Sequence, residues 1–113
     1  MNHSSYQACI DACRQCASIC NQCAAACLQE QDPAMLVTCI RLDLECAVIC
    51  SAAAELMELE GTQVDKLCAI CVEICNKCAE ECEKHGKHGM EHCAECAAVC
   101  RACATACSKM IAV

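Results

Sequence analysis

The stretch that decides the fold is CIDACRQCASICNQCAAAC, residues 9–27. Its cysteines are separated alternately by four and three residues, at Cys9, Cys13, Cys16, Cys20, Cys23 and Cys27. Because the mean spacing of about 3.5 residues is close to one turn of an α-helix, these side chains follow one side of a helix. The stretch therefore predicts a helix with a line of thiols about 26 Å long, at roughly 1.5 Å per residue.

The same spacing, which we call a cysteine ladder, recurs later in the chain. Two further ladders consist of Cys68, Cys71, Cys75, Cys78 and Cys82, and of Cys93, Cys96, Cys100, Cys103 and Cys107. A sparser set lies between them, at Cys39, Cys46 and Cys50. The segment from Ile19 to Cys27 also resembles the segment from Ile74 to Cys82, which indicates an internal repeat of one helical unit.

Capping signals precede the first two expected helices. Ser4 and Gln7 have the spacing of a capping box, which predicts a helix over about residues 4–31. Asp32 followed by Pro33 is typical of an N-cap and a first helical position, so the second helix is expected over about 33–60. In this helix the side chains expected to face the core are Met35, Cys39, Leu42, Cys46, Cys50, Ala53 and Met57.

Glycines mark the remaining boundaries. Gly61 is expected to end the second helix, and Thr62 with Asp65 to begin a third over about residues 62–84. Gly86 and Gly89 enclose a predicted turn before a fourth helix over about 90–110. With short connections and no strand signal, the sequence predicts an all-α fold: residues 1–113 as one domain, an antiparallel up-down-up-down four-helix bundle with a cysteine-lined core.

The cysteines are expected to be reduced. There are 19 in 113 residues, an odd number, and no signal peptide is visible at the N-terminus. Side chains three or four residues apart on a helix are also too far apart for an undistorted disulfide. These features favour a cytoplasmic location. The net charge of −7 argues against nucleic acid as a partner, and no apolar run is long enough to span a membrane.

So many aligned thiols indicate metal binding. Thiolates select Cu(I), zinc and iron–sulfur clusters, but zinc sites usually take four ligands from loops or turns, whereas here the ligands lie along helices. If every thiolate bridges two Cu(I) ions and every ion takes two thiolates, 19 coppers neutralise 19 thiolates. A neutral filling avoids burying a large net charge in the core. The preferred interpretation is storage and detoxification of Cu(I), at about one copper per cysteine.

Two other functions remain open. One is a general thiolate buffer for soft metals such as zinc and cadmium, and the other is a thiol redox reservoir. Catalysis is not expected, because no nucleophile and base are singled out among so many thiols, and no catalytic residue is assigned.

The repeated Cys-x-x-x-Cys-x-x-Cys ladders, with the sparser set on the second helix, resemble those of the bacterial four-helix-bundle copper storage proteins. The resemblance covers the whole chain and is to the cytosolic branch of that family. It implies that every ladder cysteine binds Cu(I), that copper enters at one end of the bundle, and that the protein is a homotetramer. A copper chaperone is a candidate partner.

The expected up-down-up-down order brings five further candidate ligands to one end of the bundle. They are His85, His88, His92, Met35 and Met90, which could receive copper and pass it to the thiolates. The alternative is that the histidines are solvated loop residues. The opposite end is expected to be closed by Tyr6, Met57, Val64 and Met110.

Overall fold

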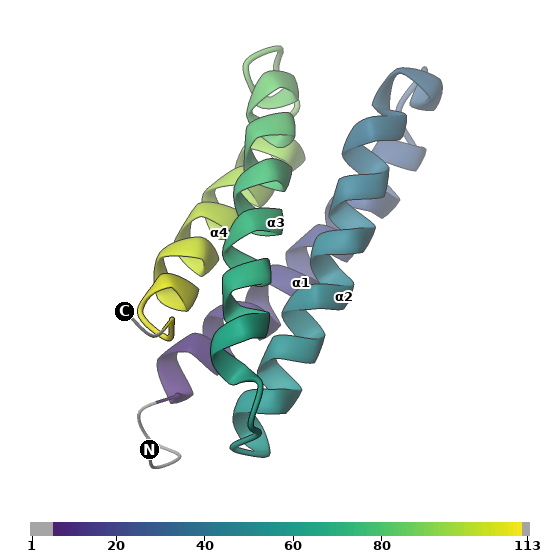
Figure 1. Ribbon diagram of the computed structural model, residues 1–113. Helices are drawn as coiled ribbons and strands as arrows, with labels where there is room; N and C mark the ends of the chain where they lie inside the picture. The colour runs from purple at the N-terminus through teal and green to yellow at the C-terminus, as the bar shows by residue number, and fades with distance from the viewer. Residues whose placement is uncertain (1–5, 112–113) are drawn as a thin grey trace.

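Four helices pack side by side in the computed structural model, which describes residues 6–111 (Figure 1). They are α1 (Gln7–Leu28), α2 (Val37–Glu58), α3 (Val64–Gly86) and α4 (Glu91–Ser108), and a short 3-10 helix, η2 (Pro33–Leu36), precedes α2. Each helix packs against the one before and the one after it, and α1 packs against α4, so the four surround a common core. The expected all-α up-down-up-down bundle is confirmed. It is elongated, measuring 47 × 20 × 18 Å.

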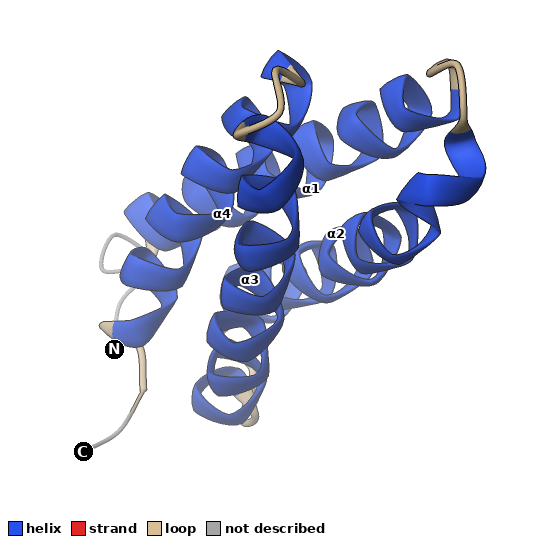
Figure 2. Cartoon of the chain, turned by 90° about the horizontal axis from the view of Figure 1, so that it is seen from above, coloured by secondary structure: helices blue, strands red, loops and turns tan. Residues whose placement is uncertain are grey.

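The connections between the helices are short, as Figure 2 shows from above. Short connections force consecutive helices to run antiparallel, which brings residues from the end of one helix beside the start of the next. Within residues 6–111, no helix is long and apolar enough to cross a membrane.

Small side chains allow the helices to pack closely around the core. The ladder cysteines face inward, and next to them lie buried alanines, among them Ala17, Ala24, Ala97 and Ala104. Each pair is seven residues apart, so both members occupy the same position after two helical turns. The narrow bundle therefore follows from cysteine and alanine taking the positions that leucine or phenylalanine fill in a common bundle.

The start of the first helix differs from the expectation. Ser4 lies outside the described residues, and α1 begins at Gln7, three residues later than predicted. The Gln7 side-chain amide does not act in a capping box but donates a hydrogen bond of 2.9 Å to the Asp11 carboxylate, one turn further on.

The first turn of the second helix is a 3-10 turn. Asp32 makes no side-chain cap bond; its backbone carbonyl instead accepts a hydrogen bond of 3.2 Å from the Met35 amide. This tighter turn rotates Leu36 into the core and leaves Met35 exposed, so the prediction of Met35 as a core residue was wrong.

The glycines act at other points than predicted. Glu60, not Gly61, takes the left-handed conformation after α2, with φ of 51°, while the Gly61 amide donates to the Leu56 carbonyl at 2.9 Å. Gly86 belongs to α3, where an added Cβ would lie only 3.1 Å from Ala94. The chain turns after it, at Gly89, whose φ is 95°.

Candidate metal-binding core

All of the ladder cysteines, and the three cysteines of α2, are buried and free of disulfides. No cysteine is more than 2% exposed. The helices turn their sulfur atoms toward the bundle axis from all sides, so the core of the protein is a column of thiols. The spacing of about 3.5 residues between these cysteines predicted that their side chains point inward.

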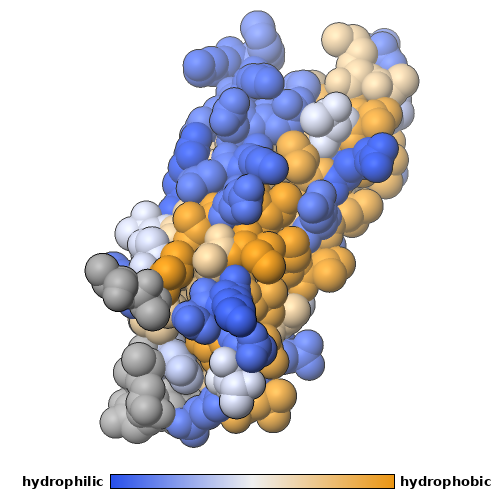
Figure 3. Space-filling model, in the orientation of Figure 1, coloured by the Kyte–Doolittle hydropathy of each residue, from blue (hydrophilic) through white to orange (hydrophobic). Residues whose placement is uncertain are grey.

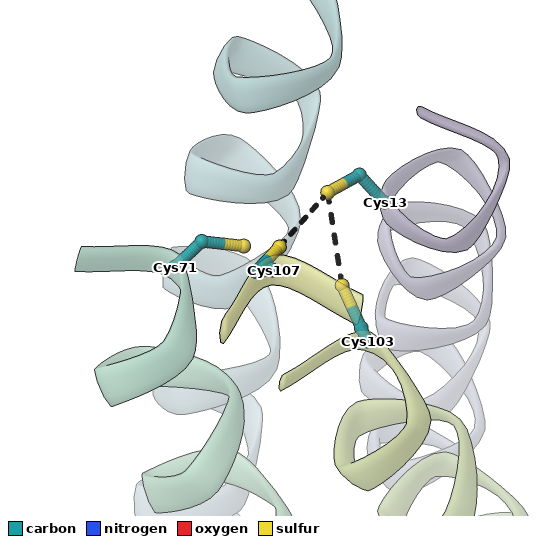
Figure 4. Close-up of side chains that lie close together, drawn as sticks. All are labelled: Cys13, Cys71, Cys103 and Cys107. Carbon is teal, nitrogen blue, oxygen red and sulfur yellow. Dashed lines mark hydrogen bonds between the residues drawn. The ribbon is translucent and has the colours of Figure 1, made fainter. Parts of the chain in front are cut away.

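The thiols meet in groups of four drawn from different helices. In one group Cys13 from α1, Cys71 from α3 and two cysteines from α4, Cys103 and Cys107, point toward a common centre (Figure 4). The Cys13 sulfur lies 3.5 Å from that of Cys107 and 3.7 Å from that of Cys103. All four sulfur atoms lie within 4.8 Å of one another. With a metal–sulfur bond of about 2.3 Å, as in zinc thiolates, one ion can reach two sulfurs up to about 4.6 Å apart.

The groups of four overlap. Cys16 and Cys46 belong to at least two groups, and Cys20 and Cys100 also belong to at least two. Five such groups are Cys13, Cys71, Cys103 and Cys107; Cys16, Cys46, Cys50 and Cys75; Cys16, Cys20, Cys46 and Cys100; Cys20, Cys78, Cys96 and Cys100; and Cys23, Cys27, Cys39 and Cys93. Because neighbouring groups share sulfurs, they cannot all be filled as isolated four-thiolate sites. Simultaneous occupation requires thiolates that bridge between ions.

A buried carboxyl group, that of Asp43, also belongs to the core, although it is not among the candidate residues expected from the sequence. Its Oδ1 atom accepts hydrogen bonds from the thiols of Cys78 at 3.1 Å, Cys96 at 3.4 Å and Cys82 at 3.5 Å. Its Oδ2 atom lies 3.9 Å from the Cys39 sulfur. Asp43 is fully buried, whereas Leu42, predicted to face the core, is only half-buried.

The ladder spacing itself contained the signal for Asp43. Cys39, Asp43, Cys46 and Cys50 are separated by four, three and four residues, which is the spacing of the first ladder. Asp43 therefore occupies the position where the other helices carry a cysteine. A search for cysteine alone could not find it, but extending the helical register through every residue type would have done so.

Burial changes the acidity of these groups. It raises the pKa of Asp43 to about 8, and the nearby Cys96 thiol, when ionised, adds to the effect. Burial likewise raises the pKa of Cys27 to about 11 and that of Cys93 above its ordinary value. In the metal-free protein the thiols of Cys27 and Cys93 are therefore protonated at neutral pH.

The five further candidate ligands gather at one end of the bundle, which we call the histidine end. His92 reaches the core directly: its Nε2 atom lies 3.5 Å from the Cys27 sulfur, and its Nδ1 atom lies 3.9 Å from the Glu30 carboxylate. His85 is half-buried, and its Nε2 atom lies 3.0 Å from the Glu81 carboxylate. Of these three histidines, His92 is the one with a ring nitrogen at hydrogen-bond distance from a core thiol among the described residues.

Two open hollows lie at the histidine end. One, of about 350 Å³, is lined by His85, His88, Met35 and Met90 together with residues of the loop before α2. The other, of about 690 Å³, is lined by His88, Met90 and His92 together with Glu30, Gly89, Glu91 and Glu95. All five predicted residues thus line one or both of these hollows, and one of them, His92, contacts the core thiol of Cys27.

The opposite end is closed by apolar side chains. Tyr6, Met57 and Val64 are buried there, and Met110 is half-buried against them. This agrees with the expectation from the sequence, and it leaves the histidine end as the one where polar ligands lead into the thiol column.

Comparison with known proteins identifies the family. Residues 2–112 match the model of the copper storage protein family. The Cu(I)-bound copper storage protein BsCsp3 is 42% identical, with 96% of this chain and 99% of that chain covered and a TM-score of 0.88. A cytosolic copper storage protein from Streptomyces lividans, in a structure with five coppers, is 35% identical, with 98% and 95% covered and a TM-score of 0.92.

A curated relative, the uncharacterized cysteine-rich protein YhjQ of Bacillus subtilis, is 43% identical over 64 residues. That match spans 57% of this chain and 59% of the length of the relative. With the family model covering nearly every residue and the bundle geometry in agreement, the chain belongs to the copper storage protein family.

Proposed function

We propose that this protein stores Cu(I) in the cytoplasm and thereby keeps free copper from other thiol and iron–sulfur sites. The cargo is held in the core by the 19 cysteine thiolates, at about one copper per cysteine, and no catalytic step is involved. The observation that carries this proposal is the overlap of the thiol groups, in which residues such as Cys16 and Cys46 belong to at least two groups of four. Bridging thiolates suit Cu(I), a soft ion that thiolates select.

Charge balance supports copper over divalent metals. Each Cu(I) ion offsets one thiolate, so the filled core approaches neutrality, whereas zinc bound by four unshared thiolates would carry a charge of −2. A buried uncompensated charge is strongly unfavourable. Asp43, which contacts three thiols, adds one further anionic donor and is proposed as an oxygen ligand at the position where α2 lacks a cysteine.

Copper is proposed to enter at the histidine end. Met35, His85, His88, Met90 and His92 offer soft or borderline ligands around the two hollows, and the contact of His92 with Cys27 gives a path from imidazole to thiolate. His92→Ala is expected to slow copper uptake and to leave the final capacity nearly unchanged. Uptake that is as fast as in the unmodified protein would remove His92 from this path.

We also propose that a chaperone delivers copper to the protein and that the protein assembles into a homotetramer. The acidic residues Glu30, Glu91 and Glu95 around the larger hollow would favour the approach of a cation or of a basic donor protein.

An anaerobic titration tests the storage function. Cu(I) and, separately, Zn(II) are added to reduced protein in competition with a chelator of known affinity, and the metal bound per chain is counted. We expect close to one copper per cysteine and far weaker binding of zinc. Saturation at four or five ions of either metal would contradict the filled core, and reversible disulfide formation without metal binding would favour a redox reservoir instead.

A further inference from the structure

Three helices supply the layer of thiols nearest the apolar end of the bundle. Cys9 of α1 and Cys107 of α4 lie there, with their sulfur atoms 3.5 Å apart. Cys68, the first cysteine of α3, is fully buried at the same end, where α3 begins. We call Cys9, Cys68 and Cys107 the terminal layer, because each is the cysteine of its helix that lies nearest this end.

The remaining helix, α2, lacks a thiol at the level of the terminal layer. Cys50 of α2 meets Cys71 of α3, with their sulfur atoms 3.6 Å apart. Because the two helices run antiparallel, the residue three positions after Cys50 lies opposite the residue three positions before Cys71. Those residues are Ala53, which is 1% exposed, and Cys68. α2 therefore contributes a methyl group where the other helices contribute thiols.

Met57 is the side chain of α2 that can replace the missing thiol. It continues the inward-facing register of the helix, since Cys50, Ala53 and Met57 are separated by three and four residues. Its side chain is completely buried. Long side chains on an α-helix lean toward the N-terminus of that helix, and for Met57 this direction leads back over Ala53. Its thioether sulfur is thereby brought toward the terminal layer.

The other described side chains that close this end are poorer donors for a soft ion. Val64 has no donor atom, and the Tyr6 hydroxyl is a hard oxygen ligand. Met110 follows α4 and is only half-buried. At the histidine end, in contrast, hydrophilic residues gather on the surface over the last turns of α3 (Figure 3). Met57 is thus the fully buried soft donor among the described residues that close the apolar end.

A thioether suits the copper ions at the end of the thiol column. In the middle of the column a thiolate can bridge to ions on both sides, whereas the terminal layer has further thiols on one side only. Thioether sulfur, like thiolate sulfur, selects Cu(I). It is also neutral, so it adds a ligand without disturbing the balance of one Cu(I) ion per thiolate.

We propose that Met57 is a ligand of Cu(I), and that its thioether completes a copper site with the thiolates of the terminal layer. This inference rests on the proposed storage of copper. It gives a binding role to a side chain that otherwise only seals the bundle, at the end opposite to the proposed entry. Because the thioether carries no proton, its coordination to copper releases none.

X-ray absorption at the selenium edge tests the bond directly, in selenomethionine-labelled protein that has been filled with copper. Met35 and Met90 are replaced by leucine in every sample, so that copper at the histidine end gives no selenium signal. A copper neighbour at bonding distance from selenium is expected. It should disappear in Met57→Leu and persist in Met110→Leu, the matched control from the same end. Absence of this neighbour, its survival in Met57→Leu or its loss in Met110→Leu would each overturn the proposal.

The transfer of copper to an excess of a competing chelator gives a second measurement. Met57→Leu nearly conserves volume, and circular dichroism checks that the variant is folded. It should release about one copper per chain at least ten-fold faster than the unmodified protein, while Met110→Leu should release copper at the unmodified rate. Equal release from Met57→Leu and the unmodified protein would contradict the role of Met57.

The copper capacity of the unmodified protein separates this inference from the storage function. A capacity of about one copper per cysteine, without a copper neighbour at the selenium of Met57, would overturn the ligand and leave storage intact. Saturation at four or five ions would overturn both.

Discussion

Asp43 is the residue that most clearly departs from a core of thiols alone. A carboxylate that is fully buried can be tolerated because its oxygen atoms accept hydrogen bonds from Cys78, Cys82 and Cys96. Those bonds do not offset its burial, since its pKa is still raised to about 8. The metal-free protein therefore holds this group in its neutral form at neutral pH.

Asp43→Asn is expected to change how the stability of the metal-free protein depends on pH. The ordinary pKa of the carboxyl is 3.8 and the folded value is about 8, so between these pH values the folded state holds a proton that the unfolded state has lost. Stability contributed by this group is therefore fully present below about pH 4 and falls as pH rises toward 8, by up to about 1.4 kcal/mol per pH unit.

Urea denaturation of the reduced protein at several pH values between 4 and 8 measures this slope. Asp43→Asn should lose the slope, and the exposed Glu45→Gln on the same helix serves as the control and should retain it. Identical slopes for the unmodified protein and Asp43→Asn would mean that the carboxyl is already ionised in the fold.

The thiols are expected to act as a set in which no single member is decisive. Cys75 lies within 4.0 Å of the sulfurs of Cys16, Cys46, Cys50 and Cys71, so its neighbours can regroup when it is removed. Cys75→Ala should lower the copper capacity by about one ion per chain, as counted in the anaerobic titration. The control is Val99→Ala, which removes packing but no thiol, and a loss of most of the capacity in Cys75→Ala would show that one site nucleates the rest.

At the scale of the elements, the ends of the helices depend on backbone geometry more than on capping side chains. None of the helices within residues 6–111 has a side-chain N-cap bond. After α2 the Glu60 amide donates to Met57 and the Gly61 amide to Leu56, which is the hydrogen-bond pattern of a Schellman motif. Its left-handed position holds Glu60 in place of the usual glycine.

Glu60→Gly is expected to stabilise the metal-free protein by about 1 kcal/mol, because a left-handed backbone costs a residue with a Cβ atom about 1–2 kcal/mol. The gain is reduced by the greater freedom of glycine in the unfolded chain. The free energy of unfolding in urea measures the change. Glu58→Gly, two residues earlier and inside the helix, is the contrasting control and should be destabilising; stabilisation by both would indicate an effect of charge instead of backbone.

At the scale of the whole molecule, the four helices form a closed column with one polar end. Apolar residues seal the end near Met57, and at the histidine end His92, which lines the larger hollow, contacts Cys27. Since burial raises the pKa of Cys27 and of Cys93, these thiols must lose protons when copper binds. Filling the core therefore exchanges protons for Cu(I) ions of the same charge.

Copper binding should accordingly release about one proton per copper, and the apparent affinity should rise about ten-fold per pH unit between pH 6 and 8. A pH indicator in weakly buffered solution counts the protons during the titration, with the copper donor alone as the blank. Binding without proton release would show that the thiols are ionised before copper arrives.

The sequence by itself determined the helices, the inward direction of the cysteines and the family. Those features depend on local periodicity: a spacing of four and three residues places side chains on one side of a helix whatever surrounds it. Only the tertiary structure decided which thiols share a group, because Cys13 meets Cys103 and Cys107 across the bundle and not along its own helix. It also decided that Asp43 accepts hydrogen bonds from Cys78, Cys82 and Cys96 and that His92 contacts Cys27, since these contacts depend on how far each helix rotates and slides against its neighbours.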